Sequence, residues 1–204
     1  MVIAIDGPAG AGKSTVARAV AQRLAFTYLD TGAMYRAVAL ATLRSGRAPA
    51  QLAAEIELEL GERVLLDGED VSAAIREPDV TAEASRVAAI PEVRRALVAR
   101  QRAIVATGDW VAEGRDVGSV VAPDAAVKVF LHAHEDERAR RRAAQLGHDV
   151  ESVRATQAER DARDSSAQRS TLAPAADAVA IDTTELALDA VVERICALVA
   201  EVRA

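Results

Sequence analysis

Residues 7–14 read Gly7-Pro8-Ala9-Gly10-Ala11-Gly12-Lys13-Ser14, which fits the pattern G-x-x-x-x-G-K-[ST] of phosphate-binding loops. The apolar run 2–5 before it has the composition of a short β-strand, and residues 15–24 after it have helical spacing. Glycines let the backbone N–H groups of such a loop turn toward phosphate oxygens, and the positive end of the following helix adds to that field. The sequence therefore predicts a strand, a loop and a helix that bind a nucleoside triphosphate.

Two side chains of the loop have distinct expected roles. Lys13 is expected to reach the β- and γ-phosphates, and the Ser14 hydroxyl to take one coordination position on Mg²⁺. Of the 25 basic residues only Lys13 and Lys128 are lysines, so a compact ammonium stands where the planar fork of arginine would be too large. The alternative interpretation is a glycine-rich turn without a ligand. The expected nucleotide contacts are Gly7, Pro8, Ala9, Gly10, Ala11, Gly12, Lys13, Ser14 and Thr15.

Composition and charge narrow the class of protein. The 204 residues suit one domain, and half of them are apolar with few aromatics, which favours an aliphatic core of helices on a parallel sheet. A net charge of −6 argues against nucleic acid or an anionic membrane as a partner held by bulk charge. The single cysteine allows no internal disulfide, and neither a signal peptide nor a membrane span is evident, so we expect a cytoplasmic protein.

Apolar runs and helical patterns alternate along the chain as they do in βα units. The predicted strands are 2–6, 27–29, 109–113, 127–131 and 178–182. The predicted helices are 13–25, 32–45, 91–106, 135–146, 149–163 and 186–202. This order predicts an α/β fold with a five-stranded parallel sheet flanked by helices, whose ligand-facing loops lie at the carboxyl ends of the strands.

Two segments depart from this alternation. Residues 55–71 alternate in polarity and then reach glycine turns, which predicts a small antiparallel ribbon beside the main sheet, with short helices at 72–76 and 80–89. Residues 137–169 are dense in arginine and acids, which is typical of helices that form a mobile lid. Most of the arginines there are expected on solvated faces, and some to close over a transferring phosphoryl group. They are Arg138, Arg140, Arg141, Arg142, Arg154, Arg160 and Arg163.

Polar residues also follow two other predicted strands. Thr31 opens the helix after the second strand and Arg36 lies one turn further on, so both could hold a second phosphate group; a capping threonine with a solvent-exposed arginine is the equally weighted alternative. After the third strand, Arg115 can bind phosphate, and the Asp116 carboxylate can accept a hydrogen bond from the exocyclic amine of cytosine. Ser85 and Arg94 could read the rest of a pyrimidine edge. The alternative at 113–118 is a solvated turn.

Six motifs, taken in order, resemble the bacterial-type cytidylate kinases, a branch of the P-loop nucleoside monophosphate kinases. They are residues 3–10, 29–36, 67–71, 84–94, 113–116 and 159–165. The resemblance implies a P-loop nucleoside monophosphate kinase fold, a monomer, and transfer of a phosphoryl group from ATP to CMP or dCMP with Mg²⁺. It also implies a single domain over 1–204, made of core segments 1–36, 91–137 and 167–204, a monophosphate-binding insertion at about 37–90 and a lid at about 138–166.

The resemblance further implies roles for individual residues. Lys13, Arg115 and Arg160 would be catalytic. The expected substrate contacts are Thr31 and Arg36 on the acceptor, Ser85, Arg94 and Asp116 on cytosine, Arg115 and Arg160 on phosphate, and Asp164 on the sugar. The chain departs from the family's pattern after Asp164, because Ala167 stands at the usual arginine and Thr171 at the usual proline. Either Arg169 replaces the missing charge, or the acceptor binds more weakly.

Two other functions stay open at this point. One is a related kinase for UMP, dTMP, AMP or a small metabolite, against which Asp116 with Arg94 and Ser85 favours an amino-pyrimidine. The other is a non-catalytic nucleotide-sensing module, which would bind nucleotide without turnover. His132 and His134, two residues apart at a strand–helix junction, are interpreted as structural residues and not as metal ligands.

Overall fold

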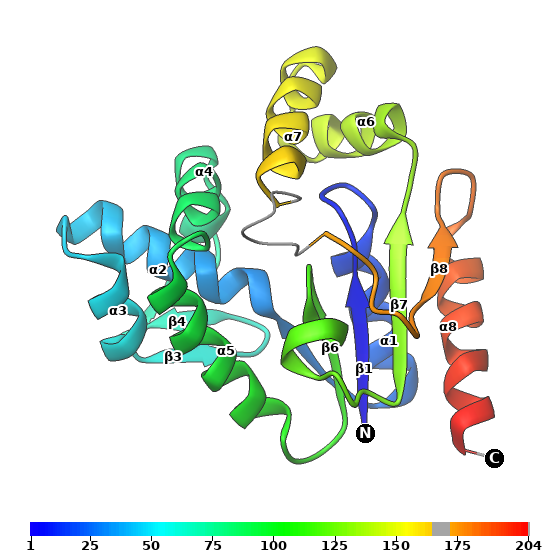
Figure 1. Cartoon of the computed structure of the whole chain (residues 1–204). Coiled ribbons are helices and arrows are strands. Elements are labelled where there is room, and N and C mark those ends of the chain that lie inside the picture. Colours follow the sequence, from blue (N-terminus) through cyan, green and yellow to red (C-terminus); the bar gives the residue numbers. More distant parts are fainter. Residues whose placement is uncertain (165–171, 204) are drawn as a thin grey trace. The chain divides into compact units, whose positions relative to one another are not determined.

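The predicted strands form one parallel sheet in the computed structural model, which describes residues 1–164 and 172–203. The order is β2-β6-β1-β7-β8, with β1 at Val2–Asp6, β2 at Thr27–Asp30, β6 at Trp110–Gly114, β7 at Val127–His132 and β8 at Val179–Asp182 (Figure 1). In the parallel register, Ile3 of β1 lies opposite Val111 on one side and Val127 on the other. The predicted five-stranded α/β fold is confirmed, and the loops after β1, β6 and β7 leave the same edge of the sheet.

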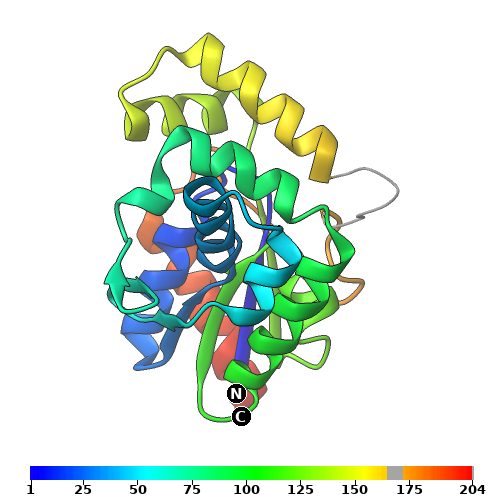
Figure 2. The ribbon, with the colours of Figure 1, turned by 90° about the vertical axis from the view of Figure 1, so that its left-hand side faces the viewer.

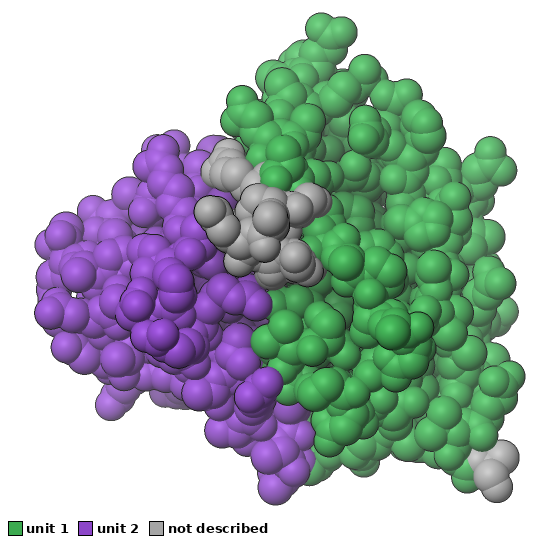
Figure 3. Space-filling view, viewed as in Figure 1, with its two compact units in different colours: residues 1–28, 108–204 green, residues 29–107 purple. Residues whose placement is uncertain are grey.

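The chain divides into two compact units (Figure 3). The first unit comprises residues 1–28 and 108–204, and the second unit comprises residues 29–107. Each unit has an apolar core of its own. Among the described residues, no helix combines the length and the apolar character that crossing a membrane requires.

In the first unit, helices pack on the sheet through aliphatic side chains. Its helices are α1 (Lys13–Leu24), η2 (Val117–Val121, a π-helix), α6 (Glu135–Leu146), α7 (Val150–Asp164) and α8 (Leu188–Arg203). Val16 of α1 and Ile195 of α8 are buried in one core with Ile5 of β1. Helices α6 and α7 pack together as a hairpin, which both ribbon views show (Figures 1 and 2).

The second unit is mostly helical. Its helices are α2 (Thr31–Ser45), α3 (Pro49–Glu55), the 3-10 helix η1 (Ala74–Arg76), α4 (Pro78–Val87) and α5 (Pro91–Val105). Proline occupies the first position of α3, α4 and α5, where its fixed φ suits a helix and its missing N–H costs nothing. Helix α3 was not predicted from the sequence, and the helix expected at 72–76 is a single 3-10 turn.

The predicted ribbon is present in the second unit as a small antiparallel sheet. It consists of β3 (Leu58–Leu60), β4 (Val64–Leu66) and β5 (Glu69–Asp70) in that order. The turn between β4 and β5 is Asp67-Gly68, with φ values of 50° and 82°. Two consecutive positive φ angles are what a tight two-residue hairpin requires, and Asp-Gly is a favoured pair for it.

The core of the second unit provides a test of its packing. Leu97 is fully buried there, whereas Leu43, on the same unit, is 51% exposed. We expect Leu97→Ala to lower the free energy of unfolding by about 2–5 kcal/mol, because it removes buried methyl groups and leaves a cavity. The matched Leu43→Ala variant should lose no more than about 0.5 kcal/mol. Urea unfolding of the purified variants measures both, and equal losses would contradict the described core.

Candidate active site

The loop between β1 and α1 has the backbone of a phosphate cradle. Gly7, Gly10 and Gly12 have φ values of 148°, 78° and 88°, and Gly12 is the left-handed N-cap of α1. A Cβ on Gly7 would lie 2.0 Å from the carbonyl oxygen of Leu131, and one on Gly10 would lie 2.7 Å from that of Arg138. The glycines therefore allow the positive φ angles of the loop and its close contacts with Leu131 and Arg138. Helix α1 begins at Lys13, as the sequence indicates.

Side chains from several elements hold the carbonyl groups of this loop. The hydrogen bonds run from Arg115 Nη1 to Gly7 O (3.2 Å), from Lys13 Nζ to Pro8 O (2.8 Å), from Arg138 Nη1 to Ala9 O (3.2 Å) and from Thr183 Oγ1 to Ala11 O (3.1 Å). A trans peptide directs its C=O and its N–H in opposite directions. Because these donors bind the carbonyls on one side, the peptides of Pro8, Ala9 and Ala11 turn the N–H groups of Ala9, Gly10 and Gly12 to the other side, where an anion can bind. The Gly7 peptide has no N–H, since its nitrogen is that of Pro8.

The N-terminus of α1 fits the magnesium chemistry expected there. Ser14 is exposed in the first turn of this helix, so its hydroxyl is available as an oxygen ligand. Among the described residues, no group of three or more His, Cys, Asp or Glu side chains could hold a metal ion by itself. A hydroxyl that adds to phosphate oxygens and water is the kind of partial site that Mg²⁺ uses with nucleotides.

Asp6, the last residue of β1, is a buried acid that the sequence analysis did not single out. Its Oδ1 accepts from the N–H of Val117 and its Oδ2 from the N–H of Gly118, both at 2.8 Å. Burial raises the pKa of Asp6 from 3.8 to about 6, although these two hydrogen bonds act in the opposite direction. Asp6 thus joins the start of the phosphate loop to the turn after β6. An acid directly before the loop was the available signal.

The turn after β6 carries the polar residues expected from the sequence. Glu113 is buried and accepts a hydrogen bond from the Tyr28 hydroxyl. Arg115 is bound to the loop carbonyl of Gly7, and Asp116 is half-buried at the start of η2, in the first unit with the phosphate loop. The turn is therefore largely shielded and hydrogen-bonded, unlike the solvated turn considered as the alternative.

The expected acceptor residues 31, 36, 85 and 94 lie in the second unit. The N-cap of α2 is Asp30 and not Thr31: Asp30 Oδ1 accepts from the N–H of Ala33 at 2.9 Å. Arg36 Nη2 donates to Asp30 Oδ2 at 2.8 Å, and a Cβ on Gly32 would lie 2.9 Å from Arg36 Nη1. Neither half of the alternative interpretation, a capping threonine and a solvent-exposed arginine, matches this geometry.

The other acceptor residues differ in their exposure. Thr31 and Ser85 are buried, at 5% and 6% exposure, and Arg94 is half-buried on α5. A buried hydroxyl needs hydrogen-bond partners, so both hydroxyls are held by their surroundings. Asp164 and Arg160 end α7, but their side chains lie outside what the structure describes. Residues 165–171, and with them Ala167, Arg169, Thr171 and the end of the expected lid, also lie outside it.

The arginines of the α6–α7 hairpin fall into different environments. Arg140 and Arg154 are largely exposed and pair with Glu137 and Asp136, as expected for a solvated face. Arg138 is buried with 9% of its side chain exposed and binds the phosphate loop. Arg141 donates to the hydroxyl and the carbonyl of Thr183, the residue that holds Ala11.

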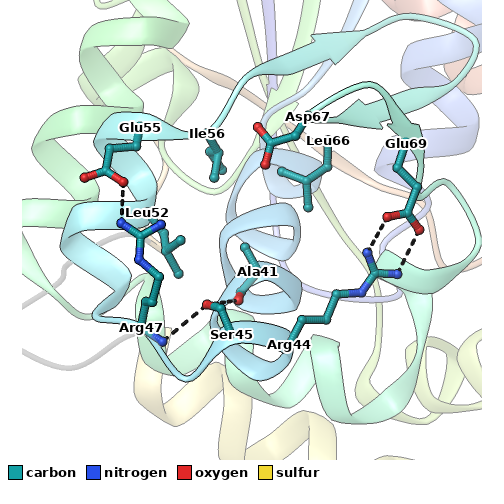
Figure 4. Close-up of a pocket in the computed structure, with 10 residues that line it drawn as sticks. All are labelled: Ala41, Arg44, Ser45, Arg47, Leu52, Glu55, Ile56, Leu66, Asp67 and Glu69. Atoms are coloured by element: carbon teal, nitrogen blue, oxygen red, sulfur yellow. Dashed lines mark hydrogen bonds and ion pairs between the residues drawn. The ribbon is translucent and has the colours of Figure 1, made fainter.

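The second unit also has an open pocket of about 340 Å³ (Figure 4). Its lining includes Leu52, Ile56 and Leu66, and its two arginines form the ion pairs Arg44–Glu69 and Arg47–Glu55. The residues that line it do not include any of the acceptor residues expected from the sequence. Each arginine is paired with an acid and Asp67 adds a further negative charge, so the pocket lacks the unbalanced positive charge that a phosphate would need.

A model of the cytidylate kinase family matches residues 3–201. The chain belongs to the cytidylate kinase family. It is 48% identical to the cytidylate kinase of Solibacter usitatus, over 98% of this chain and 92% of that protein. It is 50% identical to the cytidylate kinase of Symbiobacterium thermophilum, over 96% of this chain and 94% of the relative. The family assignment expected from the motifs is confirmed, and the chain is a nucleotide-binding kinase.

Solved structures agree on the fold. A gluconokinase from Sinorhizobium meliloti 1021 has a TM-score of 0.56 and 18% identity, with coverage of 98% of this chain and 91% of that one. A shikimate kinase from Bacteroides thetaiotaomicron has a TM-score of 0.55 and 15% identity, with 98% coverage of both chains. At such identities the likeness concerns the P-loop kinase fold and not the acceptor.

The buried Asp6 predicts an unusual pH dependence of stability. Its raised pKa means that the folded protein binds more protons than the unfolded chain between about pH 4 and pH 6, so stability from this group falls as the pH rises through that window. As the pH rises from about 4 to about 7, the wild-type protein should lose roughly 2 kcal/mol of unfolding free energy relative to Asp6→Asn, which has no charge to bury. Urea unfolding at both pH values measures this difference. A ¹³C titration midpoint of the Asp6 carboxyl near its ordinary value would contradict it.

Proposed function

We propose that this chain transfers the γ-phosphoryl group of ATP to CMP or dCMP, giving ADP and the nucleoside diphosphate. One observation carries the proposal: the chain is a cytidylate kinase family member along residues 3–201, and that span contains an intact phosphate loop. The curated relatives named cytidylate kinase align over almost their full length, so the likeness is not confined to the loop. The outward-held loop carbonyls and the acid and arginine after β6 are the local features that support it.

Each part of the reaction has a proposed residue. An oxygen of the acceptor phosphate attacks the γ-phosphorus in line, and the bond to the β–γ bridging oxygen breaks as ADP leaves. Lys13 would leave the Pro8 carbonyl and follow the β- and γ-phosphates, while Arg115 and Arg160 would neutralise the transferring group. Mg²⁺, held by Ser14 and the phosphates, would offset charge on the donor. Positioning and charge do most of the catalysis, and no covalent enzyme intermediate is required.

The acceptor residues follow the same reasoning. Thr31 and Arg36 would hold the monophosphate, and the Asp30 pair fixes the direction in which the Arg36 guanidinium points. Ser85, Arg94 and Asp116 would recognise the cytosine, because a carboxylate accepts a hydrogen bond from the exocyclic amine that uracil lacks. Asp164 would bind the sugar. The single-domain organisation, the monomeric state and the cytoplasmic location stay predictions from the sequence.

A coupled ADP-release assay with ATP and Mg²⁺ tests the proposal most directly. The panel is CMP, dCMP, UMP, dTMP and AMP, with shikimate and gluconate as alcohol acceptors. We expect turnover with CMP or dCMP well above that with any other acceptor. Preference for another acceptor would make the chain a kinase of a different substrate, and nucleotide binding without turnover on any acceptor would make it a sensing module.

Lys13→Ala tests the donor site. The variant should keep its fold, since Lys13 is only half-buried, but its kcat for CMP should fall by about three orders of magnitude or more because charge on the donor phosphates is no longer neutralised. Steady-state kinetics and circular dichroism measure the two effects. A folded variant with near-normal turnover would exclude this role for the lysine.

Asp116→Asn tests base recognition. An amide can donate a hydrogen bond where uracil has a carbonyl, so the variant should lower the ratio of kcat/KM for CMP to that for UMP by about tenfold or more. The two kcat/KM values are measured on one enzyme preparation, so an error in active concentration cancels. An unchanged ratio would remove Asp116 from the cytosine site.

A further inference from the structure

Asp161, on α7, lies between the two arginines that hold the phosphate loop. Its Oδ2 is 2.6 Å from Arg138 Nη1, and its Oδ1 is 3.8 Å from Arg115 Nη1. All three side chains are largely shielded from water, with exposures of 18%, 9% and 17% for Asp161, Arg138 and Arg115. The carboxylate therefore links the α6–α7 hairpin to the turn after β6.

Each of the two arginines also donates to a carbonyl of the loop. Arg115 donates to the carbonyl of Gly7, and Arg138 to that of Ala9, each at 3.2 Å. Arg138 also donates through Nε to the carbonyl of Ala133, so its guanidinium is held from three directions. One carboxylate thus lies beside both cations that bind loop carbonyls on either side of Pro8.

Asp161 brings a negative charge close to both of these cations. Two guanidinium groups that bind carbonyls of neighbouring residues would repel each other in a shielded site without an anion between them. Asp161 Oδ1 is buried and receives no hydrogen bond from the described residues, which lowers the stability of the fold. An acid with a purely structural role would have no reason to carry this cost. The Asp161 carboxylate therefore lies where it interacts with both Arg115 and Arg138, and not with Arg138 alone.

We propose that Asp161 is a positioning residue for phosphoryl transfer, which holds Arg115 and Arg138 so that the phosphate loop and the Arg115 guanidinium keep their geometry as charge moves to the acceptor. This inference rests on the proposed kinase function. Asp161 carries a negative charge and does not itself attract ATP, so we expect its removal to act more on the transition state, where Arg115 must neutralise the transferring group, than on the affinity for ATP.

Asp161→Asn separates these effects. Its kcat for CMP should fall by about tenfold or more, whereas the dissociation constant for ATP without acceptor should change by less than about threefold. The matched control is Glu151→Gln, which removes an acid from an exposed position on the same helix and should keep the wild-type kcat. Unchanged kcat in Asp161→Asn, or equal losses in kcat and in ATP affinity, would overturn the proposal.

A double variant tests whether Asp161 acts through Arg138. In an Arg138→Gln background, Asp161→Asn should reduce kcat by a smaller factor than in the wild-type background, because one of the two arginines that it positions is already gone. Losses that multiply would mean that Asp161 does not act through Arg138, and would overturn the inference that it positions both arginines. Should Asp161→Asn fail to fold, Asp161→Glu keeps the charge but displaces it, and is expected to lower kcat by about threefold or more with an unchanged ATP dissociation constant.

A readout independent of turnover distinguishes this proposal from the proposed function. The Nε–H of Arg138 is hydrogen-bonded to Ala133, so its exchange with water in ¹H–¹⁵N spectra should be slow in the wild-type protein and faster by about tenfold or more in Asp161→Asn. Equal exchange in both proteins would overturn the positioning role, whatever the substrate. Absence of CMP turnover in a wild-type protein that passes this test would count against the function alone.

Discussion

The first unit depends on one constraint: the carbonyl groups of the phosphate loop must be hydrogen-bonded on the side away from the anion. A loop that presents its N–H groups to an anion must turn its carbonyls the other way, and buried carbonyls need donors. Here the donors come from the turn after β6, the start of α6, the end of β8 and the loop's own lysine. Segments more than 100 residues apart in the sequence therefore converge on a few peptides. This requirement explains why polar residues gather at one edge of an otherwise aliphatic sheet.

The sheet and most helices could be predicted because their signals are local. Apolar runs gave all five strands to within one residue, and helices such as α5 and α6 begin and end within a residue of their predicted bounds. Helix α3 was missed because it is short, although Pro49 at its first position is a recognisable start signal. The expected helix at 72–76 is one 3-10 turn, which periodicity cannot distinguish over five residues.

The phosphate loop could be predicted from the local pattern around Lys13, but its contacts could not. The roles given to the motifs at 29–36 and 113–116 stay predictions from the sequence. The partners of Asp6 lie 111 and 112 residues away, and those of Arg138 in the loop lie 129 residues away, so no spacing rule reaches them. Arg138 also belongs to a run of arginines, most of which were expected on a solvated face. Only tertiary packing makes Arg138 buried and Arg140 exposed.

The close approach of Gly10 to Arg138 has a mechanical consequence for the α6–α7 hairpin. A Cβ on residue 10 would lie 2.7 Å from the backbone oxygen, 2.9 Å from the Cβ and 3.0 Å from the Cα of Arg138, so the first turn of α6 abuts the loop at this glycine. Any side chain larger than hydrogen at residue 10 would therefore push the loop and the start of α6 apart. It would also displace Arg138, which donates to the loop carbonyl of Ala9.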